Sequence, residues 1–263
     1  MLLAVDVGNT VISLGIYDDR ELRAEWHVST DRRKTHDEYG LLFMDLLEHQ
    51  GFPAQAVTAM AISSSVPPVI PTLEWMCQKY FKLKPLVIGP GVKTGMVIRY
   101  DNPREVGADR IVIAVAAYEK YGGPLVVVDF GTATIFDAIS KDGEYLGGVI
   151  APGVSISVEA LFQHAAKLPR IELVKPKTVL ARNTVHSMQS GVIYGFAGQV
   201  DAIVERLVAE LGGSPAKVKV VATGDMADVL ASEAPSIQAV DPYLALEGLR
   251  IIHERNQTGR GER

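Results

Sequence analysis

The sequence predicts an α/β protein made of two similarly built halves. The stretch LLAVDVGNTVISLGI begins at Leu2, and LVVVDFGTATIFDAI, with the same pattern, begins at Leu125. Each reads as four apolar residues, Asp, an apolar residue, Gly, two short residues and a second apolar-rich run, which is typical of a strand, a tight turn and a second strand. The 263 residues are 48% hydrophobic, enough for two cores of ordinary size. A repeat this far apart indicates two copies of one domain plan.

The first half is predicted to contain three strands, the third at 22–28, followed by alternating helices and strands. Apolar residues at 39, 42, 43, 46 and 47 share one face of a helix over 36–49. After a strand at 57–63, Pro67 and Pro68 open a helix to about 81, because the first helical turn tolerates proline. Short strands at 86–88 and 96–100 and a helix over 110–121 complete this half.

The second half repeats the order, and we expect domains at 1–117 and 118–256. Its predicted strands are at 125–129, 134–139, 144–150, 218–223 and 237–240, and its predicted helices at 155–167, 185–211 and 227–234, with a last one from Pro242. The polar, Gly- and Arg-rich segment 257–263 is predicted to be disordered. Two such domains would face each other across a cleft lined by both Asp-bearing turns.

Composition narrows the kinds of partner. A net charge of −5 predicts no general attraction to nucleic acid or to an anionic membrane. The chain has one cysteine, Cys77, in an apolar-spaced stretch, which predicts a buried thiol. The start has no basic leader and no apolar run is long enough to cross a bilayer, so we expect a cytoplasmic protein. The six histidines lack metal-ligand spacing, and we assign them no role.

The DVGNT turn has the chemistry of a phosphate site. Gly8 allows close approach of the backbone, and Asn9 and Thr10 offer short polar groups and N–H donors to phosphate oxygens. Asp6 would repel a phosphate, so its natural role is to hold a hydrated cation beside it. A single copy fits a plain hairpin equally well. Two copies, the second with Asp129, Thr132 and Thr134, favour a clamp on a polyphosphate, and this pattern resembles the actin, hexokinase and heat-shock ATPase superfamily.

The stretch RYDNPREVGADRIVIAVAAY places Asp109 and Arg110 at the start of a helix. Asp109 fits a helix N-cap, and Arg110 then fits a solvated residue of the first turn. The functional interpretation is a carboxylate base next to a cation that recognises an anionic substrate. A weak base suffices for phosphoryl transfer, which depends mainly on aligning the attacking hydroxyl.

Over nearly its whole length the chain resembles the type III pantothenate kinases. The segments that carry the resemblance are DVGNT at 6–10, GPGVKTG at 89–95, YDNPREVGADR at 100–110, DFGTA at 129–133, GGVIAPG at 147–153 and the pair Asn183 and Thr184. The resemblance implies two duplicated ribonuclease-H-like (actin-like ATPase) domains with a nucleotide cleft between them. It also implies ATP-dependent phosphorylation of pantothenate to 4′-phosphopantothenate, the first step of coenzyme A biosynthesis, by a homodimer.

The resemblance also implies roles for individual residues. Asp109 would be the catalytic base, and Asp129 would bind a monovalent cation, K⁺ or NH₄⁺. The residues expected to bind ATP with Mg²⁺ are Asp6, Val7, Gly8, Asn9, Thr10, Val11, Ile12, Ser13 and Thr132. Those expected to bind pantothenate are Tyr100, Gly107, Ala108, Asp109, Arg110 and Thr184.

Several structural alternatives remain beside these roles. Thr184 fits a helix cap, and Tyr100 fits simple packing at the end of a strand. Gly191, Gly195 and Gly198 keep one face of the long helix small, for a dimer contact or for a helix of the same subunit. Gly224 is followed by Asp225, where the superfamily commonly has a second glycine, so the adenine pocket is predicted to be narrower.

Two other functions remain compatible with the fold. The first is a non-catalytic regulator, because some members of this family were described as transcriptional activators; the intact GADR segment argues against it. The second is a kinase for another small hydroxy acid, from which only the segment between Tyr100 and Arg110 separates the pantothenate kinases.

Overall fold

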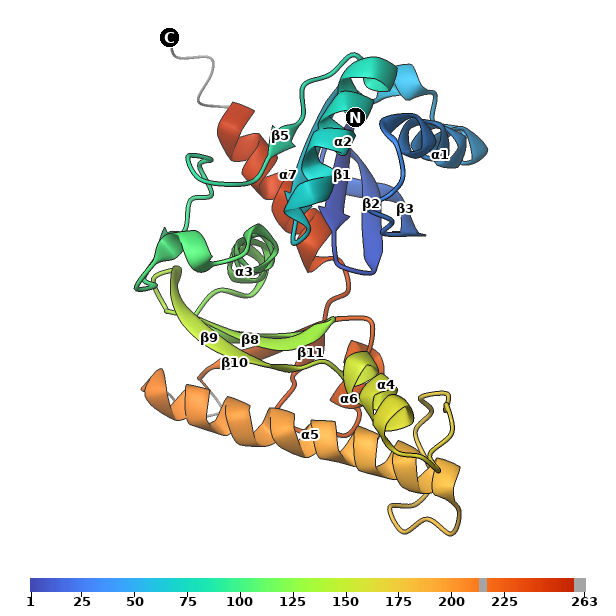
Figure 1. Cartoon of the computed structure of the whole chain (residues 1–263). Helices are drawn as coiled ribbons and strands as arrows, with labels where there is room; N and C mark the ends of the chain where they lie inside the picture. The colour runs from blue at the N-terminus through green and yellow to red at the C-terminus, as the bar shows by residue number, and fades with distance from the viewer. Residues whose placement is uncertain (213–216, 258–263) are drawn as a thin grey trace. The chain divides into compact units, whose positions relative to one another are not determined.

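The computed structural model describes residues 1–212 and 217–257, which form two compact units. The first unit contains Met1–Met96, Asn102–Ala116 and the chain from Leu244 onward. The second contains Val97–Asp101 and Ala117–Tyr243. Each unit is built around one mixed β-sheet with helices on its faces (Figure 1). No helix of the described residues has the length and apolar character needed to cross a membrane.

The first sheet has the strand order β3-β2-β1-β4-β5. Strand β1 runs antiparallel to β2 and parallel to β4. The alternating apolar residues of β1 and β2 pack with α1 and α2 into one core. The bounds are β1 Leu2–Val7, β2 Val11–Asp18, β3 Glu21–Ser29, β4 Ala59–Ser64, β5 Leu86–Val87, α1 His36–His49 and α2 Ile70–Met76.

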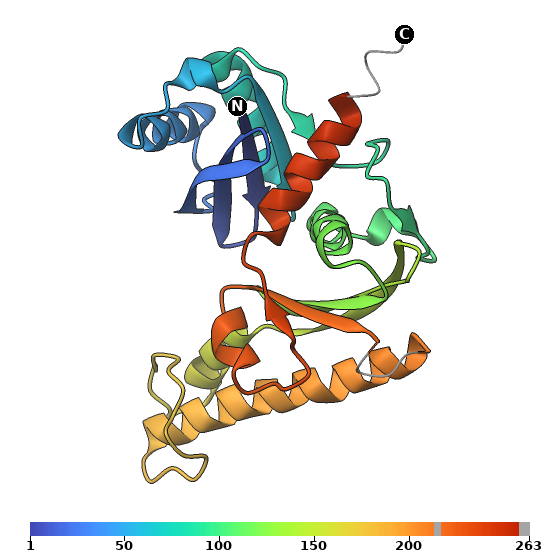
Figure 2. The same ribbon diagram turned by 180° about the vertical axis from the view of Figure 1, so that it is seen from behind.

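The two faces of this sheet carry different residues. Val5, Val7 and Ile62 belong to the core under α1 and α2. Because side chains alternate along a strand, their neighbours Asp6 and Ser63 point to the opposite face. Helix α7, Leu244–Gln257, packs on that face against β1, β2 and β4 (Figure 2).

The second sheet has the order β11-β10-β7-β8-β9-β6 and repeats the first. Strand β7 runs antiparallel to β8 and parallel to β10. Helix α5, Thr184–Glu210, runs along one face and forms a core with α4, α6 and the strands (Figure 1). The bounds are β6 Val97–Ile98, β7 Leu125–Phe130, β8 Ala133–Ile139, β9 Glu144–Pro152, β10 Lys219–Gly224, β11 Ala239–Val240, α4 Val154–His164 and α6 Ala227–Ala231. Helix α3, Ala108–Tyr121, belongs to the first unit up to Ala116 and to the second from Ala117.

The structure differs from the sequence-based expectation in the membership of two elements. The strand predicted at 96–100 is β6, which pairs with β9 of the second sheet. The last helix, assigned by sequence to the second half at 118–256, is α7 of the first unit. Its apolar face fits that sheet, where the Leu246 side chain fills the space that a side chain at Gly15 would occupy. Of the segment 257–263 predicted to be disordered, Gln257 is the last residue of α7, and 258–263 lie outside the described residues.

The segment 67–81 is helical, as predicted, but it combines three types of helix. A 3-10 turn at Pro67–Val69 leads into α2, and a π-helical turn at Cys77–Phe81 ends it. Cys77 is fully buried in the first core, as its sequence context predicts.

Candidate active site

The turn between β1 and β2 is closed by its own backbone. The Gly8 N–H donates to the Val11 carbonyl at 2.9 Å, and the Thr30 hydroxyl donates to the Gly8 carbonyl at 2.8 Å. A Cβ at Gly8 would lie only 2.9 Å from the Val11 oxygen, so the turn requires glycine here. Asn9 and Thr10 are exposed at its tip, available to a ligand.

The other hairpin residues that we expect to bind ATP alternate along their strands between buried and partly exposed positions. The side chains of Val7 and Ile12 are buried in the core, so only their backbone atoms can meet a ligand. Val11 and Ser13 are partly exposed. The Ser13 hydroxyl lies 3.2 Å from His27 Nδ1 on β3, a contact that sequence spacing alone did not reveal.

Asp6 has an unusual environment for a carboxylate at a strand end. Burial raises the pKa of Asp6, a hydrogen bond from Ser63 lowers it, and the nearby charge of Asp109 raises it slightly, so that the pKa is about 6. The Ser63 hydroxyl donates to Asp6 Oδ1 at 2.5 Å. Asp6 Oδ2 makes no hydrogen bond within the described part of the chain. A carboxylate with one oxygen fixed and one unbonded suits a cation.

Asp109 is the second residue of α3, one position inside the helix rather than at its cap. Its Oδ1 accepts a hydrogen bond from the Arg110 backbone N–H at 2.9 Å, so the carboxylate is held against the first turn. A Cβ at Gly107 would displace this oxygen from its present position. Arg110 is only 7% exposed, contrary to a solvated first-turn residue.

The second unit presents the matching turn. Asp129 is partly buried at the end of β7, and Thr132 is exposed in the turn. Thr134 is fully buried and its hydroxyl donates to the Pro152 carbonyl, so this hydroxyl has a structural role. Gly224 has φ of +91°, and a Cβ there would lie 2.8 Å from Asp129 Oδ1. The next residue, Asp225, is exposed.

Tyr100 packs over a glycine of β9. Its ring lies 3.4 Å from the position of a Cβ at Gly147, and its centroid is 6.5 Å from that of Tyr145. The buried Tyr145 hydroxyl donates to Asp137 Oδ1 at 2.7 Å, and this hydrogen bond holds the Tyr145 ring in place beside Tyr100. Packing therefore holds Tyr100 in place while part of it remains exposed.

Thr184 is the first residue of α5 and is exposed. The helix cap is Asn183, whose side chain accepts from the His186 N–H at 2.9 Å, so Thr184 is not needed as the cap. A cavity of about 810 Å³ adjoins this helix start and is lined by Lys177, Arg182 and Asn183 among others.

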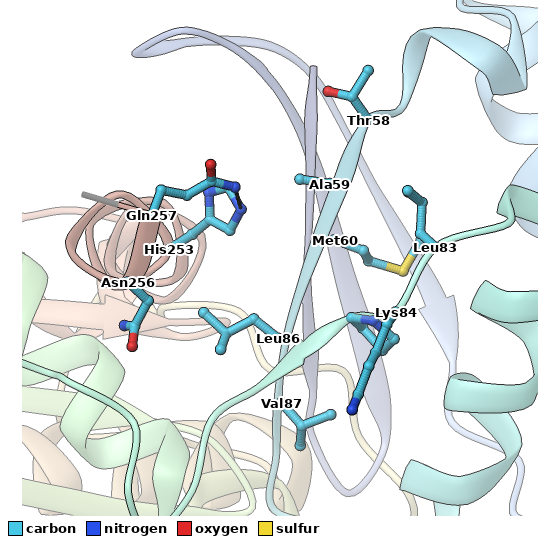
Figure 3. Close-up of a pocket in the computed structure, with 11 residues that line it drawn as sticks. Thr58, Ala59, Met60, Leu83, Lys84, Leu86, Val87, His253, Asn256 and Gln257 are labelled. Carbon is cyan, nitrogen blue, oxygen red and sulfur yellow. Dashed lines mark hydrogen bonds between the residues drawn. The ribbon is translucent and has the colours of Figure 1, made fainter. Parts of the chain in front are cut away.

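A separate cavity of about 390 Å³ lies in the first unit between β5 and the end of α7 (Figure 3). His253, Asn256 and Gln257 line one side, while Met60 and Leu86 line the other. It opens at the start of β4, whereas Ser63 and Asp6 lie near the other ends of their strands. The cavity contains none of the predicted site residues.

The donor set limits how a cation could be held. Nowhere in residues 1–212 and 217–257 do three or more His, Cys, Asp or Glu side chains form a metal-binding group. Mg²⁺ in phosphate-transfer sites is typically bound by one or two carboxylates together with substrate phosphates and water. Asp6 beside a phosphate-binding turn fits that pattern.

The predicted residues thus fall into two sets. The hairpin of residues 6–13 and the segment Gly107 to Arg110 belong to the first unit, where Asp6 and Asp109 interact electrostatically. Tyr100, Asp129, Thr132 and Thr184 belong to the second. Two units of one plan, each with an Asp before a Gly turn, define the class of actin-like phosphotransferases and ATPases.

Solved structures share this fold. A protein from Campylobacter jejuni described as a Baf family transcriptional activator superposes with a TM-score of 0.60 at 19% identity, covering 97% of this chain and 99% of that one. A protein from Listeria monocytogenes described as an N-acetylmannosamine kinase gives 0.53 at 9% identity, with 97% and 99% covered. At these identities the likeness shows the fold alone.

Sequence comparisons identify the family. The family model for type III pantothenate kinase matches residues 2–206. Type III pantothenate kinase 2 of Symbiobacterium thermophilum is 65% identical over 98% of this chain and 97% of its own length. Type III pantothenate kinase of Myxococcus xanthus is 58% identical over 97% and 99%. The chain belongs to the type III pantothenate kinase family.

Proposed function

We propose that the protein transfers the γ-phosphoryl group of ATP to the terminal hydroxyl of pantothenate, giving 4′-phosphopantothenate for coenzyme A synthesis. Family membership supports the substrates. The observation that carries the proposal is the proximity of Asp109, on the predicted substrate segment, to Asp6, on the phosphate-binding hairpin, since the charge of one shifts the pKa of the other.

The residue roles follow from this arrangement. The hairpin of residues 6–13 holds the phosphates through backbone N–H groups and short side chains, while Asp6 faces a phosphate-bound Mg²⁺. Asp109 accepts the proton of the pantothenate hydroxyl as its oxygen attacks the γ-phosphorus and the bond to ADP breaks. Gly107, Ala108 and Arg110 belong to the same pocket.

The second unit supplies the remaining groups of the proposed site. Thr132 contacts the nucleotide, and Asp129 binds K⁺ or NH₄⁺, for which a carboxylate oxygen is a suitable hard ligand. Tyr100 and Thr184 contact pantothenate. Their partly or fully exposed positions support these roles.

A homodimer in the cytoplasm completes the proposal. Gly191, Gly195 and Gly198 lie on the exposed face of α5, and a Cβ built at any of them meets no described atom within 4 Å. This face is therefore not used for packing inside the chain, which supports a contact with a second subunit.

A regulatory function on the same fold is not favoured. The relatives at 65% and 58% identity are kinases by name, whereas the transcriptional activator is only 19% identical. The Gly107 to Arg110 segment is intact and folded around Asp109.

The test is phosphate transfer from ATP to pantothenate with Mg²⁺, followed by mass spectrometry in potassium or sodium buffer. Product formed preferentially in potassium supports the site as a whole. Folded protein that forms no product with ATP or other nucleoside triphosphates, in either buffer, would overturn it.

A further inference from the structure

Ser63 is a buried polar residue to which the sequence assigned no role. It lies on β4 next to Asp6 in the parallel register and is 0% exposed. Its hydroxyl donates to Asp6 Oδ1 at 2.5 Å, a short hydrogen bond of the kind made to a carboxylate. Water cannot replace this donor at a buried position, so the orientation of the Asp6 carboxylate depends on Ser63.

The second unit repeats this placement. Thr223 of β10 pairs with Asp129 of β7 at the register position that Ser63 of β4 holds beside Asp6. Thr223 is also buried, at 4% exposed. A buried hydroxyl-bearing residue thus stands on the parallel strand beside each of the two aspartates.

We infer that Ser63 is a positioning residue for nucleotide binding: its hydrogen bond fixes Asp6 Oδ1 and thereby turns Oδ2 toward the cation that accompanies the ATP phosphates. This inference rests on the proposed role of Asp6. Without the bond, the carboxylate is free to rotate about χ2, and the cation loses a preorganised ligand.

The test compares Ser63→Thr with Ser63→Val, two variants of nearly equal size that differ in the hydroxyl. Threonine already occupies the corresponding position in the second unit, so the fold has a precedent for it. We expect kcat/KM for MgATP to stay within about 3-fold of wild type in Ser63→Thr and to fall about 10- to 100-fold in Ser63→Val and Ser63→Ala, the range for losing a hydrogen bond to a charged group. KM for pantothenate should change less than about 2-fold, a split that general destabilisation would not produce.

Ser64→Ala is the matched control. Ser64 follows Ser63 on β4, but its side chain accepts from the Val66 N–H and does not touch Asp6. Its loss should leave kcat/KM for MgATP unchanged. Equal losses in the Thr and Val variants of Ser63 would mean that packing matters rather than the hydroxyl, and wild-type values in both would also overturn the inference.

Asp6→Asn separates this inference from the proposed role of Asp6. If Asp6→Asn retains wild-type kcat/KM for MgATP, the role of Asp6 fails. If Asp6→Asn is impaired but the Ser63 variants are not, only the positioning inference fails. In the Asp6→Asn background, Ser63→Val should add less than about 2-fold, because coupled residues are not additive.

Discussion

Asp6 and Asp129 occupy the same position in two different sheets. Each is the fifth residue of a six-residue strand, and each pairs with the third residue of the following antiparallel strand. Each also pairs with the fifth residue of a parallel strand, Ser63 or Thr223. The environments beyond this frame differ, since Asp6 is held by Ser63 while Asp129 packs beside Gly224. One plan thus gives the two aspartates different surroundings.

Replacing Asp109 with Asn should lower kcat by about 10²- to 10⁴-fold, because the amide cannot accept the hydroxyl proton. Folding should be little changed, since the amide oxygen can still accept from the Arg110 N–H. Steady-state kinetics measure kcat, and thermal unfolding measures the stability of the variant. Asp142→Asn, in an exposed turn, is the control. Near-normal turnover in Asp109→Asn would show that Asp109 is not the base.

Replacing Asp129 with Ala should abolish the preference for potassium over sodium. The proposed cation would lose its charged ligand, so rates in the two buffers should converge to a ratio of about 1. Activity is measured in matched KCl and NaCl with saturating Mg²⁺. A retained potassium preference in folded Asp129→Ala would place the cation site elsewhere.

The raised pKa of Asp6 predicts that this residue destabilises the ligand-free protein at neutral pH. The folded-state pKa of about 6 exceeds the ordinary 3.8, so the contribution to stability is fully present below pH 3.8 and is lost as the pH rises through 6. The shift corresponds to roughly 3 kcal/mol. Asp6→Asn should therefore raise Tm relative to wild type at pH 8 by several degrees, and at pH 5, midway between 3.8 and 6, by about half as much.

Thermal unfolding in EDTA without nucleotide measures this difference, since a bound cation would mask it. Asp142→Asn again serves as the control and should show no such pH dependence. A Tm gain for Asp6→Asn that is equal at both pH values would contradict a burial-raised pKa.

Gly195→Arg should convert the proposed dimer to a monomer. A side chain at this position meets no described atom of its own chain, and replacing a helical glycine lowers the cost in backbone entropy, so the subunit should remain folded. Light scattering after size-exclusion chromatography gives the mass. Gln50→Arg adds the same charge at an exposed site after α1 and should leave the mass unchanged. A dimeric Gly195→Arg would exclude this face as the contact.

The sequence was most informative where periodicity is strong. Helix α1 has the predicted ends at His36 and His49, and both Asp-bearing hairpins form as the repeat predicts. The local sequence pattern does not reveal which sheet a short strand pairs with or which sheet a helix covers. For this reason the sequence places β6 and α7 in the wrong halves. Ser63 was missed for a related reason: its hydrogen bond to Asp6 joins residues far apart in the chain.

The return of α7 to the first sheet affects the order in which the protein can fold during synthesis. Strands β1, β2 and β4 leave the ribosome before the second unit, but α7, the helix that covers one of their faces, is made after it. The second unit, by contrast, is complete once Tyr243 has emerged. The first unit therefore keeps apolar surface open to chaperones, or to aggregation, until the whole second unit and then α7 have been made.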